Sequence, residues 1–401
     1  MRKNSRGVLL ALGIGAIALV VAACGGSDSK AGGSSGDLVI GMSISQTGAF
    51  APYDGPVLDG AKYAAEQINK AGGVDGKKIK LVVKDNKFDA ALAVQTTQEL
   101  IDQKVNALIV ACENSQAIAS GQLAQTAKIP ALSTCNTSVR TPKAVGDYMF
   151  ISLFSDNQQA SMAADYACGK GYKTAYLLRS PDTEALDTTP LYFATAFKKI
   201  CGGEVSGTDT FKSGSTDYTP QIQKLKNLDS QPDVIYSYIY VPDTAAFLKQ
   251  LRAGGVKTPL IAADGNDDAS LVTAAGKAAA EGFVFTSHGF PADGSPLKKL
   301  VDDYTAAVGS PPSNAPFLGD GWDQIHLIAE AAKLGGGTDP EQIKNGMEKI
   351  SGFAGALGSY TYGPFPDGHA PKKDICLVTI KAGTPTLIRC GQPSYVAPFK
   401  F

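Results

Sequence analysis

The sequence has few of the residues and motifs on which enzyme chemistry depends. It contains only 3 histidines, His288, His326 and His369, and none of them accompanies a GxSxG nucleophile turn. No P-loop and no GxGxxG stretch follows the first predicted strand. We therefore expect no enzyme and no cofactor, with the histidines in structural or solvent-exposed positions. His288 alone lies at a strand end near a predicted crossing between lobes, where it could reach a cleft.

An excess of charge of one sign is also missing. The chain has 37 Lys and Arg against 38 Asp and Glu, a net charge of −1, so it offers no basic face for nucleic acid. No cysteine pair has CxxC spacing, and we predict no metal site. With 401 residues, 44% of them hydrophobic and 19% charged, the chain is typical of a globular protein of two domains.

Long apolar runs are absent after the first 23 residues. The start, "MRKNSRG", is basic, and the apolar run "VLLALGIGAIALVVAA" is shorter than the roughly 20 residues of a membrane-spanning helix. This order predicts a secretory signal over 1–23. The next stretch, "VAACG", resembles the lipobox of bacterial lipoproteins, which implies lipidation at Cys24 and a flexible tether over 24–36. The alternative is a plain secretory signal with a chance cysteine.

The other six cysteines allow fifteen pairings, which the predicted elements narrow to one set. A hairpin centred near Gly383 has one cysteine seven residues to each side, at opposed positions. A second pair ends two consecutive strands, and a third ends two consecutive helices. The predicted disulfides are Cys112–Cys135, Cys168–Cys201 and Cys376–Cys390. Disulfides persist in oxidising compartments, so they agree with export to a periplasm or a Gram-positive cell surface.

From residue 37 onwards, strand and helix patterns alternate. The strand "DLVIGMSIS" is followed by a helical pattern ending at Gly72, and the alternation continues to about 155 before it restarts. This order predicts an α/β fold with two parallel-sheet lobes, each covered by helices on both faces. We assign 37–155 plus 289–358 to lobe one and 156–288 plus 359–401 to lobe two, with a multi-segment hinge and a cleft between them.

Polar side chains follow the predicted strands at the points where ligands of open α/β sheets bind. The residues in these places are Glu113, Asn114, Ser115, Asn136 and Thr137 of lobe one, and Tyr240 and Asp264 of lobe two. Ser115 also begins a predicted helix, whose first N–H groups are unpaired and suit an anion such as a carboxylate. A site that binds an anion on one side and presents a carboxylate and a phenol on the other is complementary to a free amino acid.

The stretch "IAADGNDD" contains Asp264 and could also be a calcium loop. Positions 6 and 12 of such a loop would both be alanine here, where glycine and glutamate are needed. We therefore expect Gly265 to let the chain turn out of a strand. Asp267 or Asp268 is expected to cap the helix that begins near Ser270.

Two blocks of the sequence resemble the leucine/isoleucine/valine-binding proteins of bacterial ABC transporters. They are "SQTGAFAPYDGPVLDGAKYAAEQINKAGGVDGKKIKLVVKD" and "PDVIYSYIYVPDTAAFLKQLRAGGVKTPLIAADG", in the family's order and spacing. The resemblance, over about 37–400, implies the type I periplasmic-binding fold, also called a Venus flytrap. It implies a protein that captures an amino acid, closes on it, and delivers it to a membrane permease. We expect the protein to be a monomer.

The resemblance also assigns roles to individual residues. Asn114, with Ser115 beside it, falls where the family usually has a serine that holds the ligand carboxylate. Thr137, next to Asn136, falls on the second carboxylate contact, and Asp264 falls on the acid that binds the ammonium group. Asp264 is one methylene shorter than the glutamate that stands here in a well-characterised family member. The remaining positions, near the ligand, are Tyr240, Tyr53 and Phe317.

Each of these positions has a structural alternative. Asn114 and Ser115 could simply cap a helix, and Thr137 could satisfy loop backbone. The three aromatic side chains could simply pack. A family tyrosine is missing from "SPDTEALDTT", where Asp182 or Thr183 could replace it. These departures leave open a binder of urea, amides or aromatic acids, or a ligand-sensing receptor without transport.

Overall fold

The computed structural model describes residues 36–268 and 270–399. The predicted signal peptide, the predicted lipidation site Cys24 and all but the last residue of the tether lie outside these residues. Within the described part of the chain, no helix is both long and apolar enough to cross a membrane.

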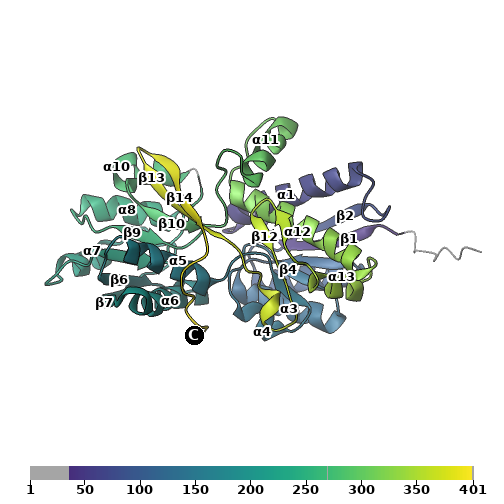
Figure 1. The fold of residues 1–401 in the computed structure, drawn as a ribbon, viewed down its shortest axis with the longest axis horizontal. Helices are drawn as coiled ribbons and strands as arrows, with labels where there is room; N and C mark the ends of the chain where they lie inside the picture. The colour runs from purple at the N-terminus through teal and green to yellow at the C-terminus, as the bar shows by residue number, and fades with distance from the viewer. Residues whose placement is uncertain (1–35, 269, 400–401) are drawn as a thin grey trace, which may run out of the picture. The chain divides into compact units, whose positions relative to one another are not determined.

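The first sheet has five strands in the order β2-β1-β3-β4-β5, all parallel. Its strands are β1 (Leu38–Ile44), β2 (Ile79–Asp85), β3 (Ala107–Val110), β4 (Ala131–Ser133) and β5 (Met149–Ile151). The helices between them are α1 (Ala51–Lys70), α2 (Ala90–Asp102), α3 (Asn114–Ala127) and α4 (Arg140–Val145). Every crossover between neighbouring strands therefore contains a helix, as a parallel sheet requires. Figure 1 shows these elements in purple and blue.

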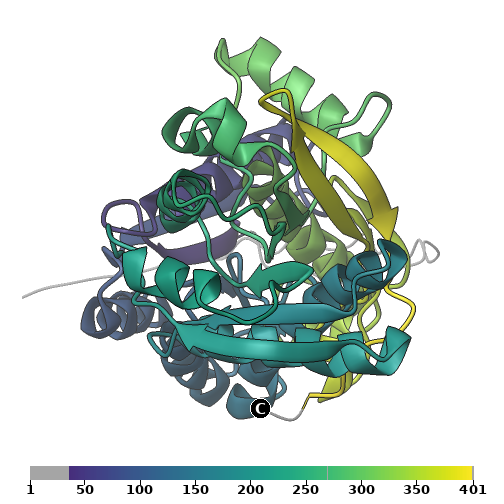
Figure 2. The ribbon, with the colours of Figure 1, turned by 90° about the vertical axis from the view of Figure 1, so that its left-hand side faces the viewer.

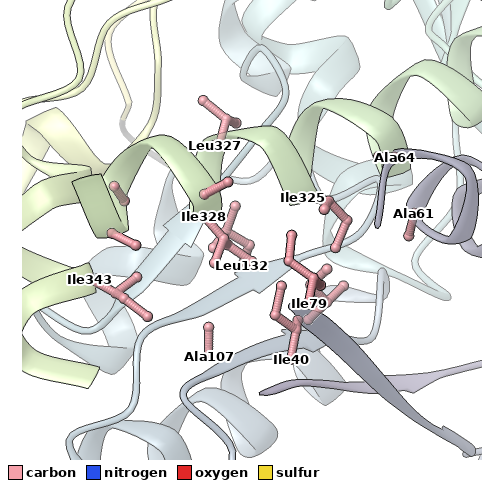
Figure 3. Packing of buried hydrophobic residues seen from close by; sticks show 14 of the residues in the cluster. Ile40, Ala61, Ala64, Ile79, Ala107, Leu132, Ile325, Leu327, Ile328 and Ile343 are labelled. Atoms are coloured by element: carbon pink, nitrogen blue, oxygen red, sulfur yellow. The ribbon is translucent and has the colours of Figure 1, made fainter. Parts of the chain in front are cut away.

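Three later helices return to this lobe, together with two short strands that form a sheet of their own. They are α11 (Pro296–Val308), α12 (Ala315–Gly335), α13 (Pro340–Met347), β11 (Phe353–Gly355) and β12 (Gly358–Tyr360). The core forms where α1 and α12 pack on the strands, and Figure 3 shows Ala61 and Ala64 of α1, Ile325 and Ile328 of α12 and strand residues such as Ile40 in this cluster. Ala61 and Ala64 are one helical turn apart, so they share a face of α1, as their spacing predicts.

The second sheet has seven strands in the order β14-β13-β10-β9-β8-β6-β7. Its strands are β6 (Thr174–Arg179), β7 (Glu204–Thr210), β8 (Val234–Ser237), β9 (Leu260–Ala262), β10 (Val284–Ser287), β13 (Ile375–Lys381) and β14 (Thr384–Gly391). Its helices are α5 (Asp156–Gly169), α6 (Glu184–Cys201), α7 (Thr219–Lys226), α8 (Asp243–Ala253), α9 (Ser270–Ala275) and α10 (Lys277–Ala280). The strands β6 to β10 are parallel, and the β13–β14 hairpin, yellow in Figure 2, adds two antiparallel strands. Two parallel-sheet lobes are thus present, as predicted.

One part of the predicted lobe assignment differs from the packing. We placed 359–401 with lobe two, but Tyr360 and Tyr362 belong to the hydrophobic core of the first sheet. His369, in a short 3-10 helix (Asp367–His369), has its Nδ1 atom 2.9 Å from the carbonyl oxygen of Met149 in β5. The chain therefore leaves the first sheet only after His369.

All three predicted disulfides are present: Cys112–Cys135, Cys168–Cys201 and Cys376–Cys390. The hairpin register pairs Cys376 directly with Cys390, as the symmetric spacing about Gly383 predicts. The first disulfide joins the loops that follow β3 and β4. It therefore lies at the carboxyl edge of the first sheet, where a ligand site is expected.

Candidate functional site

A cavity of about 90 Å³ lies between the carboxyl ends of the two sheets. Its walls come from the loops after β3 and β4 in the first lobe and after β8 and β9 in the second. A single water needs roughly 10–15 Å³ of such space, so the cavity has room for a small molecule. The place agrees with the rule that ligands of α/β sheets bind beyond the strand carboxyl ends.

The structure brings seven of the eight predicted ligand residues together around this cavity. They are Tyr53, Asn114, Asn136, Thr137, Tyr240, Asp264 and Phe317. The eighth, Ser115, is exposed and does not line the cavity, and its hydroxyl donates to the Glu113 carboxylate. Glu113 also accepts from the Gln116 N–H at 3.0 Å and so caps helix α3 with its own charge. The anion that we expected at this helix end is therefore a side chain of the protein.

Eleven further residues line the cavity that were not among the eight predicted ligand residues. They are Phe50, Cys112, Glu113, Cys135, Ser138, Asp156, Thr183, Ala185, Leu186, Tyr238 and Gly265. Tyr238 could have been found, because it precedes Tyr240 by two residues and strand side chains alternate. Asp156 gave no such signal, because an acid at a helix start is usually only a favourable charge at the helix N-terminus. Of the two candidates for the missing family tyrosine, Thr183 lines the cavity and Asp182 does not.

Asp264 stands at the tip of β9 with its carboxylate buried and one hydrogen-bond partner on each oxygen. Its Oδ2 lies 2.8 Å from His288 Nε2, and its Oδ1 accepts from Gln159 Nε2 at 2.8 Å. Burial would raise the pKa of this carboxyl, but the charge and hydrogen bond of His288, with help from Tyr238 and Gln159, hold the pKa below its ordinary value. Asp264 therefore faces the cavity as a carboxylate.

The opposite wall offers hydrogen-bond donors. The backbone N–H groups of Asn136 and Thr137 donate to no acceptor within residues 36–268 and 270–399. The Asn136 side chain is already occupied, because its Nδ2 donates to the Cys112 carbonyl at 3.0 Å and its Oδ1 accepts from the Ser138 N–H at 3.0 Å. The free backbone groups, and not the Asn136 amide, are therefore what this wall presents to an anion.

Asn114 connects the two lobes. Its Nδ2 donates to Glu184 Oε2 at 2.6 Å, and its Oδ1 accepts from the Thr141 hydroxyl. Arg140 Nη1 lies 2.9 Å from the same Glu184 oxygen. Glu184 is the first residue of α6 in the second lobe, whereas Asn114 and Arg140 belong to the first lobe. We call these three residues the interlobe clasp.

Aromatic rings form the apolar part of the cavity wall. The Tyr53 ring packs edge-on against Phe317 and Tyr240, at centroid distances of 5.4 and 6.2 Å. Its hydroxyl donates to the Val241 carbonyl at 2.8 Å and so forms another bond between the lobes. Gly265 has a φ of +86°, and a Cβ there would lie 2.9 Å from Tyr240 Cβ, so the predicted turn requires glycine.

The remaining predictions for the "IAADGNDD" stretch can also be followed in the structure. Asp268 accepts from the Ser270 N–H at 2.6 Å, so its side chain satisfies the first N–H group of α9. Asp267 instead accepts from the Ser287 hydroxyl at 2.6 Å. Of the three histidines, His288 contacts a lining carboxylate, whereas His326 packs against Trp322 and has a pKa lowered to about 4 by burial.

Two α/β lobes with a small cavity between their strand ends are typical of two-lobed solute-binding proteins. The family model for the periplasmic binding protein matches residues 37–385. The chain therefore belongs to the periplasmic binding protein family, and the resemblance inferred from its sequence is confirmed.

Individual relatives agree with this family. The chain is 25% identical over 341 residues to Leu/Ile/Val-binding protein homolog 1 of Brucella suis, covering 84% of this chain and 88% of that protein. The branched-chain amino acid transporter substrate-binding protein LivJ of Streptococcus pneumoniae, solved with isoleucine, is 28% identical with a TM-score of 0.77 and coverages of 89% and 99%. A benzoate-bound solute-binding protein of R. palustris, at 21% identity, TM-score 0.76 and coverages of 90% and 98%, shows the fold alone.

Proposed function

We propose that this protein is an extracytoplasmic solute-binding protein that captures an amino acid, branched-chain or similar, and delivers it to an ABC importer. Lipidation of Cys24 would hold it at the membrane surface, and the tether over 24–36 would let it reach the permease. Binding occurs by closure of the lobes and involves no chemistry on the ligand.

The cavity supports this proposal because one wall favours a cationic group and the opposite wall favours an anionic group. The Asp264 carboxylate faces it from the second lobe, and the free N–H groups of Asn136 and Thr137 face it from the first. An α-amino acid has one cationic and one anionic group attached to the same carbon atom. It can therefore satisfy both walls at once, and only when both lobes contact it.

The apolar wall sets the expected side chain of the ligand. Phe50, Phe317 and Leu186 line the cavity with apolar side chains, and Tyr53 adds its ring, because its hydroxyl already donates to the Val241 carbonyl. The named ligands of the relatives, leucine, isoleucine and valine in Brucella suis and isoleucine in Streptococcus pneumoniae, have side chains of this kind. We therefore expect an apolar side chain of moderate size.

Asp264→Asn tests the proposal. Removing one charge of a buried pair typically costs roughly 3–5 kcal/mol, so affinity for leucine or isoleucine should fall on the order of a thousandfold by titration calorimetry. Asp267→Asn is a matched control, because Asp267 lies three residues further on and does not line the cavity. Unchanged affinity in Asp264→Asn, with the control also unchanged, contradicts an ammonium-binding role.

A thermal-shift screen separates the ligand classes. A ligand at 100 times its dissociation constant should stabilise the protein by about 2.7 kcal/mol. The panel contains apolar and charged amino acids, urea, acetamide and benzoate. If a neutral amide or benzoate raises the melting temperature and no α-amino acid does, then the protein serves the alternative ligand class and the proposal is wrong.

A further inference from the structure

Asp156 is a second carboxylate in the cavity wall, and it belongs to neither predicted ligand group. It is the first residue of α5, its side chain is buried, and it lines the same cavity as Asp264. Its Oδ1 accepts from the Thr137 hydroxyl at 2.7 Å. Asp156 therefore lies beside the wall whose N–H groups are proposed to hold the ligand carboxylate.

One amide group bridges the two carboxylates. Gln159 Nε2 donates to Asp156 Oδ1 at 3.0 Å and to Asp264 Oδ1 at 2.8 Å. The orientation of this amide is fixed, because Gln159 Oε1 accepts from the Asp264 N–H at 3.0 Å and from the Thr286 hydroxyl at 2.8 Å. Two acid groups thus converge on a single neutral donor at the edge of the cavity.

The titratable groups that face Asp156 are carboxyl groups and phenols, and none of them is basic. The groups that face it are Asp264 at the end of β9, Glu184 on α6, and Tyr236 and Tyr238 on and after β8. No basic side chain in the described residues forms an ion pair with Asp156, whereas Asp264 has His288 on its far oxygen. Burial, together with the charge of Asp264, raises the pKa of Asp156 to about 7.

We propose that the cationic group of the ligand binds between Asp156 and Asp264 and displaces a proton that Asp156 carries in the ligand-free protein. The inference rests on the proposed function, because it needs a cationic ligand in this cavity. Two neighbouring buried carboxylates with one shared donor do not both ionise readily until a cation neutralises them. The ligand ammonium supplies that cation, and the carboxyl proton of Asp156 passes to the solvent.

This coupling has a definite sign. A bound cation favours the ionised carboxylate, so the pKa of Asp156 is lower in the complex than in the free protein. Affinity therefore levels off as the pH rises past the pKa of about 7, and well below that pKa it falls by up to about tenfold per pH unit until the pKa of the complex is reached. At pH 6 close to one proton is released per ligand, and at pH 7 about half a proton.

Calorimetry measures the proton directly. Isoleucine is titrated into the purified protein at pH 6 in two buffers with different ionisation enthalpies, and the difference in apparent binding enthalpy gives the number of protons released. We expect close to one proton for the natural sequence and close to none for Asp156→Asn, which keeps the side-chain shape. Equal binding enthalpies in the two buffers for the natural sequence overturn the inference.

The affinity of the same variant provides a second readout. Asp156→Asn removes a hydrogen bond to a charged group, so at pH 8 isoleucine should bind about 10- to 100-fold more weakly. Asp209→Asn is the matched control, because Asp209 is a buried carboxylate of β7 that pairs with Lys224 and does not line the cavity. Its affinity and its proton release should equal those of the natural sequence.

The two proposals fail in different ways. If no amino acid binds the natural sequence at any pH, the proposed function is wrong. If isoleucine binds and Asp264→Asn abolishes binding, but Asp156→Asn binds with unchanged affinity and unchanged proton release, then the function stands and the shared cation site is wrong.

Discussion

The interlobe clasp should strengthen ligand binding without touching the ligand, and Glu184→Gln tests this. Glu184 accepts from Asn114 at 2.6 Å and from Arg140 at 2.9 Å, and it does not line the ligand cavity. Glutamine keeps the size of the side chain but loses its charge. The variant should therefore weaken closure of the lobes while leaving the cavity wall intact.

The exposure of the partners sets the size of the effect. The Arg140 side chain is 54% exposed, so its ion pair contributes about 0–1 kcal/mol. The Asn114 bond ends on a carboxylate that is only 21% exposed, and bonds to charged groups are worth roughly 1.5–3 kcal/mol. Because glutamine can still accept one bond, we expect a net loss of about 1–2 kcal/mol, which corresponds to a 5- to 30-fold weaker affinity.

Stopped-flow kinetics and calorimetry with isoleucine provide the measurement. The loss of affinity in Glu184→Gln should come mainly from faster dissociation of isoleucine, since the clasp forms only when the lobes meet. The matched control is Asp187→Asn, which lies one helical turn along α6 and pairs with Arg179 at 2.9 Å within the second lobe. An equal loss in both variants would show a general effect on α6, and no loss in Glu184→Gln would refute a role in closure.

Two further predictions concern the cavity wall. Gly265→Ala places a Cβ 2.9 Å from Tyr240 Cβ at a φ of +86°, so it should lower the free energy of unfolding by roughly 1–3 kcal/mol and weaken isoleucine binding. Chemical denaturation and calorimetry measure these two effects. An unchanged free energy of unfolding and an unchanged affinity would contradict the expected strain. Replacing both Cys112 and Cys135 by alanine opens a link between residues 23 apart, which should cost about 3 kcal/mol of stability. The affinity for isoleucine should fall as well, whereas loss of the hairpin disulfide Cys376–Cys390 should reduce stability alone. Equal affinities in the two variants would contradict this prediction.

Much of the fold could be predicted because its signals are local. The alternation of strand and helix patterns, the spacing of the cysteines and the turn at Gly265 each depend on neighbouring residues, and the structure confirms them. The same holds for strand-end residues such as Asp264, because position after a strand already places a side chain at the carboxyl edge of a sheet.

The parts that could not be predicted depend on contacts between distant segments. The bridge from Gln159 to Asp156 and Asp264 joins α5 to the tip of β9 and needs the folded lobe to exist. Ser115 was expected to bind an anion, but the neighbouring Glu113 side chain folds back on the helix end. Likewise, residues 359–369 stay with the first sheet because Tyr360 and Tyr362 pack there, which no local pattern indicates.

The Cys112–Cys135 disulfide determines when the wall of the ligand cavity is complete. Both cysteines line the cavity, and their bond joins the two loops that present Asn114 on one side and the free N–H groups of Asn136 and Thr137 on the other. Disulfides form in oxidising compartments and not in a reducing cytosol. On the proposed export, the Cys112–Cys135 bond would form, and complete this wall, only after the chain leaves the cytosol.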